Sequence, residues 1–310
     1  VIKKQAFKFL LEPNKSQLFD FLLFAGSCRF VYNKGLALLN ENYRSGKKFM
    51  GYNQLASELV EWKNEDSLSW LKEAPSQCLQ QSLRDLDRAF RNFFTGKSQY
   101  PKFKKKGRHD SFRIPCQRVR LDQEKKLVSL PKVGWVKYRK SREIIGDLKN
   151  VTISMKQGKW YISFNTEHTV PDPIHPSDVK TTIVLNNECD VHLSFVVGRD
   201  YTHQAEEKKK LIRLHKTLTR RNKYSKNWLK TKRKIDSIKS KSARSRLDNI
   251  HKATTAICKK HAVVEVVSLM DSVSDKNDIT LKMRYEFVRQ LIYKQEWLGG
   301  EVIRREIKPL

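Results

Sequence analysis

The apolar residues near the start of the chain are spaced in two different ways. Apolar and polar residues alternate over residues 2–11, which predicts a β-strand with one apolar face. From Lys15 onward the apolar residues recur every three or four positions, which predicts a series of helices. Pro75 followed by Ser76 is a typical start for the last of them. We therefore expect residues 15–95 to form a small helical module.

Short alternating runs separated by turn residues follow this module and predict strands. Six are expected, over residues 111–114, 118–121, 127–130, 135–138, 150–156 and 159–166. Gln157 and Gly158 separate the last two runs and predict a hairpin turn. We expect the N-terminal strand to join this sheet, so that the helical module is an insertion into a β-domain.

The second half of the chain begins with a proline-rich segment, residues 169–178, which predicts a linker. Beyond it the patterns predict two strands, a helical hairpin, a strand, a helix and a strand. The corresponding ranges are 181–185, 191–197, 205–260, 262–269, 280–298 and 301–307. The continuous apolar run at 262–269 is typical of a strand buried on both faces. This order predicts an α/β domain, and the whole chain is expected to be multidomain α+β.

The chain has 310 residues, enough for two or three domains, and its hydrophobic content of 39% excludes a wholly disordered protein. No apolar run approaches the about 18 residues of a membrane span, and the N-terminus lacks the pattern of a signal peptide. We therefore expect a cytoplasmic protein with no membrane partner. The five cysteines lie far apart without a CxxC pair, and the eight histidines form no ligand motif. The sequence thus predicts neither disulfides nor a metal site.

Charge changes this picture. Lysine and arginine number 63 against 33 acidic residues, a net charge of +30 that predicts a polyanionic partner. Residues 97–142 hold sixteen Lys and Arg against three acids, and residues 205–260 hold twenty against four. The alternative for the second zone is a solvated helix face, but such faces usually mix charges four residues apart. Here Lys226, Lys230 and Lys234 repeat at that spacing and repel one another. We therefore interpret both zones as nucleic-acid-binding surfaces.

Seven long strings of the sequence carry a family resemblance. In the first half they are FVYN (30–33), SWLKEAPSQCLQQSLRDLDRAFRNFF (69–94), YPKFKKKGRHDSFR (100–113) and LPKVGWVKYR (130–139). In the second half they are LTRRNKYSKNWLK (218–230), RLDNIHKATTAICKKHAVVEVV (246–267) and LIYKQEWLGGEV (291–302). Together these strings resemble the TnpB family of transposon-encoded nucleases over nearly the whole chain.

The resemblance implies a β-barrel wedge domain, an inserted helical recognition module and a truncated RNase H-like (RuvC) α/β domain. The implied ranges are 1–14 and 96–168 for the wedge domain, 15–95 for the insertion, 169–178 for the linker and 179–310 for the RuvC-like domain with its basic hairpin at 205–260. It also implies a guide RNA, and double-stranded target DNA with a short adjacent motif. We expect one protein chain per RNA and no cofactor other than that RNA.

A RuvC nuclease needs three carboxylates to hold two metal ions. The family's first aspartate, in a pattern resembling GIDLG, falls at Val184, and valine cannot bind a hard cation. Its second acid, in a pattern resembling VEDL, falls at Glu265 and is followed by Val266. In members of the family, the third aspartate and a four-cysteine zinc motif follow the segment that matches the end of this sequence at Leu310. Asp190 is a poor substitute because it lies past the strand turn. We therefore expect no nuclease activity, no catalytic residue and no bound metal, with Glu265 paired with a lysine of the basic hairpin.

The helical module keeps residue types that suit contacts with DNA bases. The positions that match the family's readers of the adjacent motif are Tyr52, Ser76, Gln77 and Gln80. Glutamine can bridge N6 and N7 of adenine, although ordinary exposed helix polarity is the alternative. The cations expected on the backbones of the guide RNA and heteroduplex are Lys102, Lys104, Lys105, Lys106, Arg108, Arg113, Arg220, Arg221, Lys223, Lys226 and Lys230.

Three functions are compatible with these patterns. The first is an RNA-guided, nuclease-dead DNA-binding protein, most like the TldR repressors derived from TnpB. It would associate with the bacterial nucleoid and block transcription through an R-loop beside the adjacent motif. The second is a metal-dependent RNA-guided endonuclease, residual or completed by another chain. The third is a decayed transposon fragment. The sequence favours the first.

Overall fold

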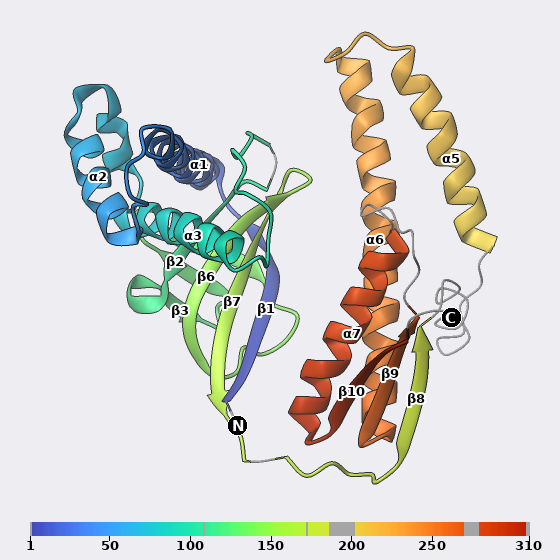
Figure 1. Cartoon of the computed structure of the whole chain (residues 1–310). Helices are drawn as coiled ribbons and strands as arrows, with labels where there is room; N and C mark the ends of the chain where they lie inside the picture. Colours follow the sequence, from blue (N-terminus) through green and yellow to red (C-terminus); the bar gives the residue numbers. More distant parts are fainter. Residues whose placement is uncertain (1, 108, 172, 186–201, 270–278, 308–310) are drawn as a thin grey trace. The chain divides into compact units, whose positions relative to one another are not determined.

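The computed structural model describes residues 2–107, 109–171, 173–185, 202–269 and 279–307 (Figure 1). The chain divides into two compact units, residues 2–169 and residues 170–310. Each unit combines a sheet with helices, so the fold is mixed α+β. Within the described ranges, no helix has the length and apolar character needed to cross a membrane.

The first unit is built on a curled antiparallel sheet of seven strands (Figure 1). The strands are β1 (Ile2–Glu12), β2 (Ser111–Pro115), β3 (Arg120–Asp122), β4 (Leu127–Leu130), β5 (Gly134–Arg139), β6 (Asp147–Lys156) and β7 (Lys159–Thr169). Their spatial order is β2-β6-β7-β1-β5-β4-β3, so the N-terminal strand lies between β7 and β5. The end strands β2 and β3 do not pair with each other in the described residues. The sheet is curled, and the barrel-like wedge domain that the family resemblance implies stays an expectation.

One strand is shorter than its pattern predicts. The pattern gives a strand over residues 118–121, but Cys116–Arg118 form a short 3-10 helix, η2, and β3 begins at Arg120. The N–H of Val119 donates to the carbonyl of Cys116 at 3.0 Å, which closes this turn. Pro115 has no N–H with which to continue the ladder of β2. The chain therefore turns before it can pair again.

The helices lie between β1 and β2 in the chain. They are α1 (Lys15–Arg44), α2 (Tyr52–Asn64) and α3 (Ser76–Phe94), with a 3-10 helix η1 (Asp66–Glu73) after α2. A capping box starts α1: Asn14 Oδ1 accepts from the N–H of Gln17 at 2.8 Å, and Gln17 Oε1 accepts from the N–H of Asn14 at 3.1 Å. Helix α1 approaches α3 so closely that a Cβ at Gly35 would lie 3.0 Å from Leu86 Cδ2. Glycine at this position thus lets the two helices pack.

An aromatic cluster fixes α1 to the sheet. The ring of Phe21 lies 5.2 Å from Trp160 of β7 and 5.8 Å from Phe112 of β2, centre to centre. Phe24, one turn further, meets Phe112 edge to face at 5.6 Å. All four side chains are buried. Such ring pairs contribute about 0.5–1.5 kcal/mol beyond the burial of their area, so this cluster holds the helical module on the sheet.

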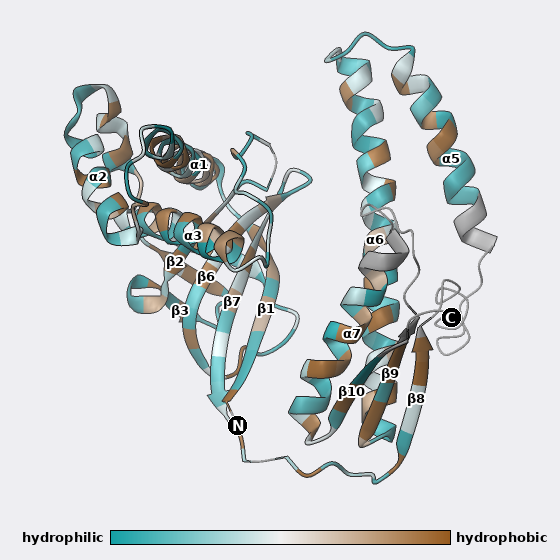
Figure 2. Ribbon diagram, in the orientation of Figure 1, coloured by the Kyte–Doolittle hydropathy of each residue, from teal (hydrophilic) through white to brown (hydrophobic). Residues whose placement is uncertain are grey.

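The second unit contains a parallel sheet with three described strands in the order β10-β9-β8. The strands are β8 (Lys180–Leu185), β9 (Val263–Leu269) and β10 (Glu301–Ile307), and the helices are α5 (Thr202–Thr219), α6 (Lys226–Lys260) and α7 (Ile279–Leu298). Figure 2 shows the hydrophobic residues of β8 and β9. The prediction that β9 is buried on both faces is wrong in part. Val264 and Val266 pack against α6 and α7, whereas Glu265 faces the opposite side and is partly exposed. The strand predicted over residues 191–197 lies outside the described residues.

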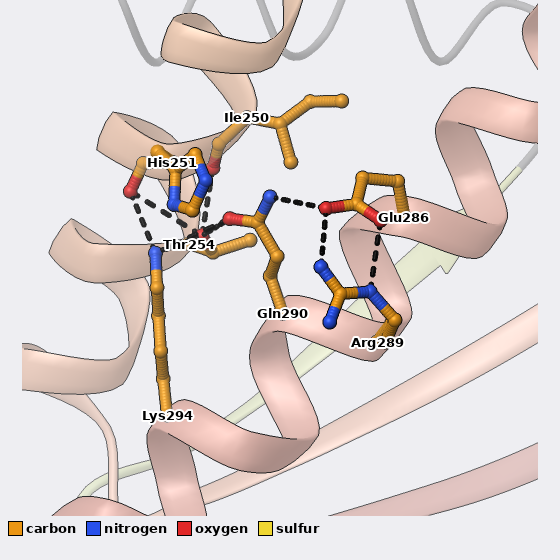
Figure 3. A network of polar contacts seen from close by, with 7 residues as sticks. All are labelled: Ile250, His251, Thr254, Glu286, Arg289, Gln290 and Lys294. Carbon is orange, nitrogen blue, oxygen red and sulfur yellow. Dashed lines mark hydrogen bonds and ion pairs between the residues drawn. The ribbon is translucent and has the colours of Figure 1, made fainter. Parts of the chain in front are cut away.

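A polar network joins α6 to α7 beside their apolar contact (Figure 3). The ammonium of Lys294 donates to the carbonyl of His251 at 2.8 Å and to Thr254 Oγ1 at 2.6 Å. Gln290 is fully buried, and its Nε2 donates to Glu286 Oε1 at 2.8 Å. Its Oε1 accepts from Thr254 Oγ1 at 3.2 Å. Because buried polar groups require partners, these bonds fix the register of α7 along α6.

Glu286 makes this contact sensitive to pH. Its pKa is lowered chiefly because Arg289 donates two hydrogen bonds to it, at 2.8 and 2.7 Å, while the charge of His251 on α6 acts in the same direction. A carboxylate whose pKa is lower in the folded state than its usual 4.5 stabilises the folded state at pH values above 4.5. This stabilisation is lost as the pH falls through the lowered pKa. Acidification from about pH 6 to about pH 3 should lower the urea concentration at the unfolding midpoint. We expect this decrease to be smaller for Glu286→Gln than for the native chain. The control is Glu296→Gln, an exposed glutamate of the same helix. Equal acid sensitivity of the two variants would contradict the prediction.

Candidate nucleic-acid interface

Polar and basic side chains gather where α2 meets the N-terminal half of α3. Ser76, Gln80 and Arg84 follow one another at four-residue spacing and so share one face of α3. Tyr52, the first residue of α2, lies beside this face, with its ring centre 4.6 Å from the guanidinium carbon of Arg84. Lys63, near the end of α2, donates to Ser76 Oγ at 2.8 Å. The structure thus brings three of the predicted motif readers together beside two cations.

The predicted readers differ in the polar atoms they offer to DNA. Gln80 is exposed, and its amide has no hydrogen-bond partner among the described residues. Gln77 is half-buried and donates to Gln117 Oε1 of η2 at 3.3 Å, which ties α3 to the sheet edge. Gln80 is therefore the reader whose donor and acceptor are both available.

Lys63 is a candidate that the sequence does not single out. Burial lowers its pKa, and the charge of Lys132 lowers it further. Lys132 donates to the carbonyls of Lys72 and Glu73 at the end of η1, at 2.7 and 3.2 Å. Two lysines that lie far apart in the chain therefore converge near Ser76. No periodicity marks them, because the contact exists only after α2, η1 and the β4–β5 turn have folded together.

The lysine run of residues 102–106 is held on α1 by Asn33. Its Nδ2 donates to the carbonyl of Lys104 at 3.0 Å, and the N–H of Lys104 donates to Asn33 Oδ1 at 2.8 Å. Although Lys104 as a whole residue is exposed, its ammonium lies 3.9 Å from the ring centre of Tyr32. Burial lowers the pKa of this ammonium, with Asp85 acting in the opposite direction. Lys104 thus turns inward, and the cations of the run that remain exposed are Lys102, Lys105 and Lys106.

Arg108 and Arg113 are the two arginines of this zone that are predicted to contact phosphates. Arg113 is half-buried, and its Nη1 lies 3.3 Å from Asp85 Oδ1. Its guanidinium is therefore engaged within the protein. Arg108 lies outside the described residues, so its phosphate contact stays a prediction.

The hairpin of α5 and α6 directs most of its predicted phosphate contacts outward. Arg221 is the exception: its Nη1 donates to the carbonyl of Asn227 at 2.6 Å and also to Thr231 Oγ1. These bonds fix the turn that joins the two helices. The exposed cations of the predicted set are Arg220, Lys223, Lys226 and Lys230.

Glu265 lies in the middle of β9, on the face opposite α6 and α7. Its carboxylate accepts a hydrogen bond from Thr182 Oγ1 at 3.2 Å, and its Oε1 lies 2.7 Å from Arg305 Nε of β10. The predicted pairing with a lysine of the basic hairpin is wrong, because the neighbouring strand already supplies the cation. Val184 follows Thr182 by two residues on β8 and therefore shares the face of Glu265.

This face does not fit a pair of metal ions in the described part of the chain. Two-metal centres need several carboxylates. On this face the described residues place Glu265, which is paired with Arg305, and Glu301 at the start of β10. The described ranges also contain no group of three His, Cys, Asp or Glu side chains that could hold a metal ion. Asp190 lies outside the described residues.

Known proteins resemble this chain over most of its length. The chain is 44% identical over 320 residues to "Putative RNA-guided DNA endonuclease InsQ" of Escherichia coli (strain K12), which covers 96% of this chain and 79% of that protein. It is 26% identical over 312 residues to a "Putative RNA-guided DNA endonuclease" of Streptomyces pristinaespiralis, covering 97% and 77%. Residues 3–48, which hold most of β1 and all of α1, match the family HTH_OrfB_IS605, described as a helix-turn-helix domain. A solved CRISPR-Cas12f ternary complex aligns with 95% of this chain and 71% of its own, but its 16% identity and TM-score of 0.28 are too low to carry an argument.

These relatives correct the predicted activity. The prediction that the chain is not an enzyme is wrong, because the 44% identical relative is named as an endonuclease. On this identity and coverage, the chain belongs to the TnpB/IS605 family.

Proposed function

We propose that this chain binds a guide RNA and, through it, double-stranded DNA beside a short adjacent motif, as an RNA-guided DNA endonuclease. The observation that carries the proposal is the shared face of Tyr52, Ser76 and Gln80, flanked by Lys63 and Arg84. A glutamine amide can read adenine in the major groove, and cations beside it contact the phosphates that set its register. The names of the two relatives support RNA and DNA as partners.

The exposed cations away from this face suit a different task. The lysines of the 102–106 run and of the α5–α6 hairpin offer charge without the paired donor and acceptor that read a base. In RNA-guided recognition, base pairing reads the target, while the protein holds the nucleic-acid backbone and the adjacent motif. We assign these cations to the backbones of the guide RNA and of the RNA–DNA heteroduplex.

The fate of the bound DNA is a separate part of the proposal. The names of the relatives support cutting. A stable RNA–DNA hybrid over a promoter would also block RNA polymerase, which is the repressor role that the sequence suggests. That effect requires only the bound state and does not depend on whether the DNA is later cut.

Sequencing the RNA that co-purifies with the protein tests the central claim. We expect a discrete small RNA with one segment that is complementary to a DNA target, because the exposed cations hold a backbone and leave sequence recognition to base pairing. Bulk cellular RNA with no enriched species would contradict the proposal.

A plasmid assay tests cutting. With the co-purified RNA bound and Mg²⁺ present, we expect a plasmid with a matched target to be linearised and one with a mismatched target to stay intact. Gel-shift binding of the same two targets is measured in parallel. If the matched plasmid is bound but stays intact, the cutting part fails while the binding part stands.

Motif reading and backbone binding are separable by mutation. Gln80→Ala is expected to reduce discrimination at one position of the adjacent motif by about 1–3 kcal/mol while leaving non-specific binding unchanged. Lys105→Gln is the matched control, expected to weaken all targets alike and to reduce the salt slope by about 1. Fluorescence anisotropy on a set of motif variants at several salt concentrations measures both. A uniform loss for Gln80→Ala would show that it reads no base.

A further inference from the structure

Five aromatic rings form a continuous cluster at the C-terminal end of α3, which we call the aromatic platform. Its members are Phe49, Phe90, Phe93, Phe94 and Tyr100. Phe90 lies beneath the others, with ring centres 5.2 Å from Phe49 and 5.5 Å from Tyr100. Phe94 lies 5.3 Å from Phe49 and 5.6 Å from Phe93. Each ring contacts at least two others, so three separate chain segments form one surface.

The outer rings of the platform are exposed, although each of them also contacts other rings of the cluster. Phe90 is 3% exposed, whereas Phe94 is 60%, Phe49 43% and Tyr100 42% exposed. The hydroxyl of Tyr100 donates to Asn40 Oδ1 at 2.5 Å, which fixes the ring against α1. A contiguous exposed apolar surface of this kind marks an interaction site.

The charge around the platform is positive. The two segments that carry the outer rings, residues 42–51 and 91–106, contain no acidic residue. Lys47 and Lys48 directly precede Phe49, and Lys97 follows Phe94 by three residues; all three lysines are exposed. A partner with flat apolar faces and a negatively charged backbone is complementary to this surface. Nucleic acid with unpaired bases has both properties.

We propose that the aromatic platform binds single-stranded DNA by stacking its bases on Phe94 and the neighbouring rings. Bases within a duplex already stack on each other and offer no free face, so the ligand is an unpaired strand. The inference rests on the proposed function, because pairing of a guide RNA with one DNA strand leaves the other strand unpaired.

The position of the platform on α3 favours DNA over RNA. Gln80 and Phe94 lie fourteen residues apart on one helix, which separates them by about 21 Å. That is less than one turn of duplex DNA, about 34 Å. A strand that separates from the duplex beside the proposed motif contacts would therefore meet the platform within one helical turn. The guide RNA and the strand paired with it keep their bases in the heteroduplex.

Substitution of Phe94 in the full chain tests this inference. Binding to fluorescent oligo(dT) of about 20 nucleotides is measured by anisotropy, with a blunt duplex and an oligo(U) RNA of the same length as further arms. Phe94→Ala is expected to weaken oligo(dT) binding about fivefold to about hundredfold, the effect of losing one stacked base. Its salt slope should stay unchanged, because stacking releases no counterions. Phe94→Tyr keeps a ring and should bind as the native chain does.

The matched control is Phe19→Ala, which removes a phenylalanine on α1 that is 65% exposed and has no ring partner among the described residues. It should leave oligo(dT) binding unchanged. Unchanged binding of Phe94→Ala, or an equal loss for Phe19→Ala or for the duplex, would overturn the inference. A larger loss for oligo(U) would assign the platform to RNA and overturn its assignment to DNA. None of these binding measurements requires a guide RNA. Failure to recover a guide RNA would therefore reject the proposed function without affecting the test of the aromatic platform.

Discussion

The contact of Phe21 and Phe24 with the sheet is the interaction on which the first unit depends. Helix α1 follows β1 directly, and the helical module returns to the sheet only at β2, so this contact sets where the whole module lies. Helix α3 is then oriented by α1, with Ser82 Oγ donating to the carbonyl of Cys28 at 2.6 Å. One end of α3 bears the proposed motif-reading face, and the other bears the aromatic platform. Both surfaces therefore inherit their position from a buried aromatic contact that touches neither of them.

The high net charge is accommodated because the fold separates its cations into two groups. Lys104, Arg113 and Arg221 are turned toward a ring, a carboxylate and a helix start, where they serve the structure. The others stay exposed, and many on the hairpin have like-charged neighbours four residues away. Folding alone leaves that repulsion in place. A bound polyanion neutralises these cations. The free energy of binding therefore includes relief of the charge repulsion that is present in the free protein.

The sequence could predict the elements but not all of their ends or partners. Alternation and helical spacing mark nearly every described strand and helix, because burial of one face imposes those periods. The late start of β3 depends on one backbone hydrogen bond after Pro115, and the partner of Glu265 depends on which strand lies beside β9. Neither of these contacts produces a periodic pattern in the sequence. The structure places three predicted motif readers, Tyr52, Ser76 and Gln80, near Lys63, and that proximity follows from tertiary packing, which the sequence pattern does not show. The prediction that the chain is not an enzyme rested on several of the family's acidic and cysteine positions, and the name of the 44% identical relative contradicts it.

The pair of hydrogen bonds between Asn33 and Lys104 has an entropic consequence for binding. The described residues between positions 95 and 110 form no helix or strand. A free loop of this length would lose conformational freedom when a polyanion ordered it. Asn33 holds the middle of the segment, and the carboxylate of Asp110 accepts from the N–H of Gly107 at 2.9 Å near its end. These hydrogen bonds restrain the backbone beside the exposed lysines without a ligand. Pre-organisation of this kind lowers the entropic cost of association, so a disordered lysine tract of equal charge should bind nucleic acid more weakly than this one.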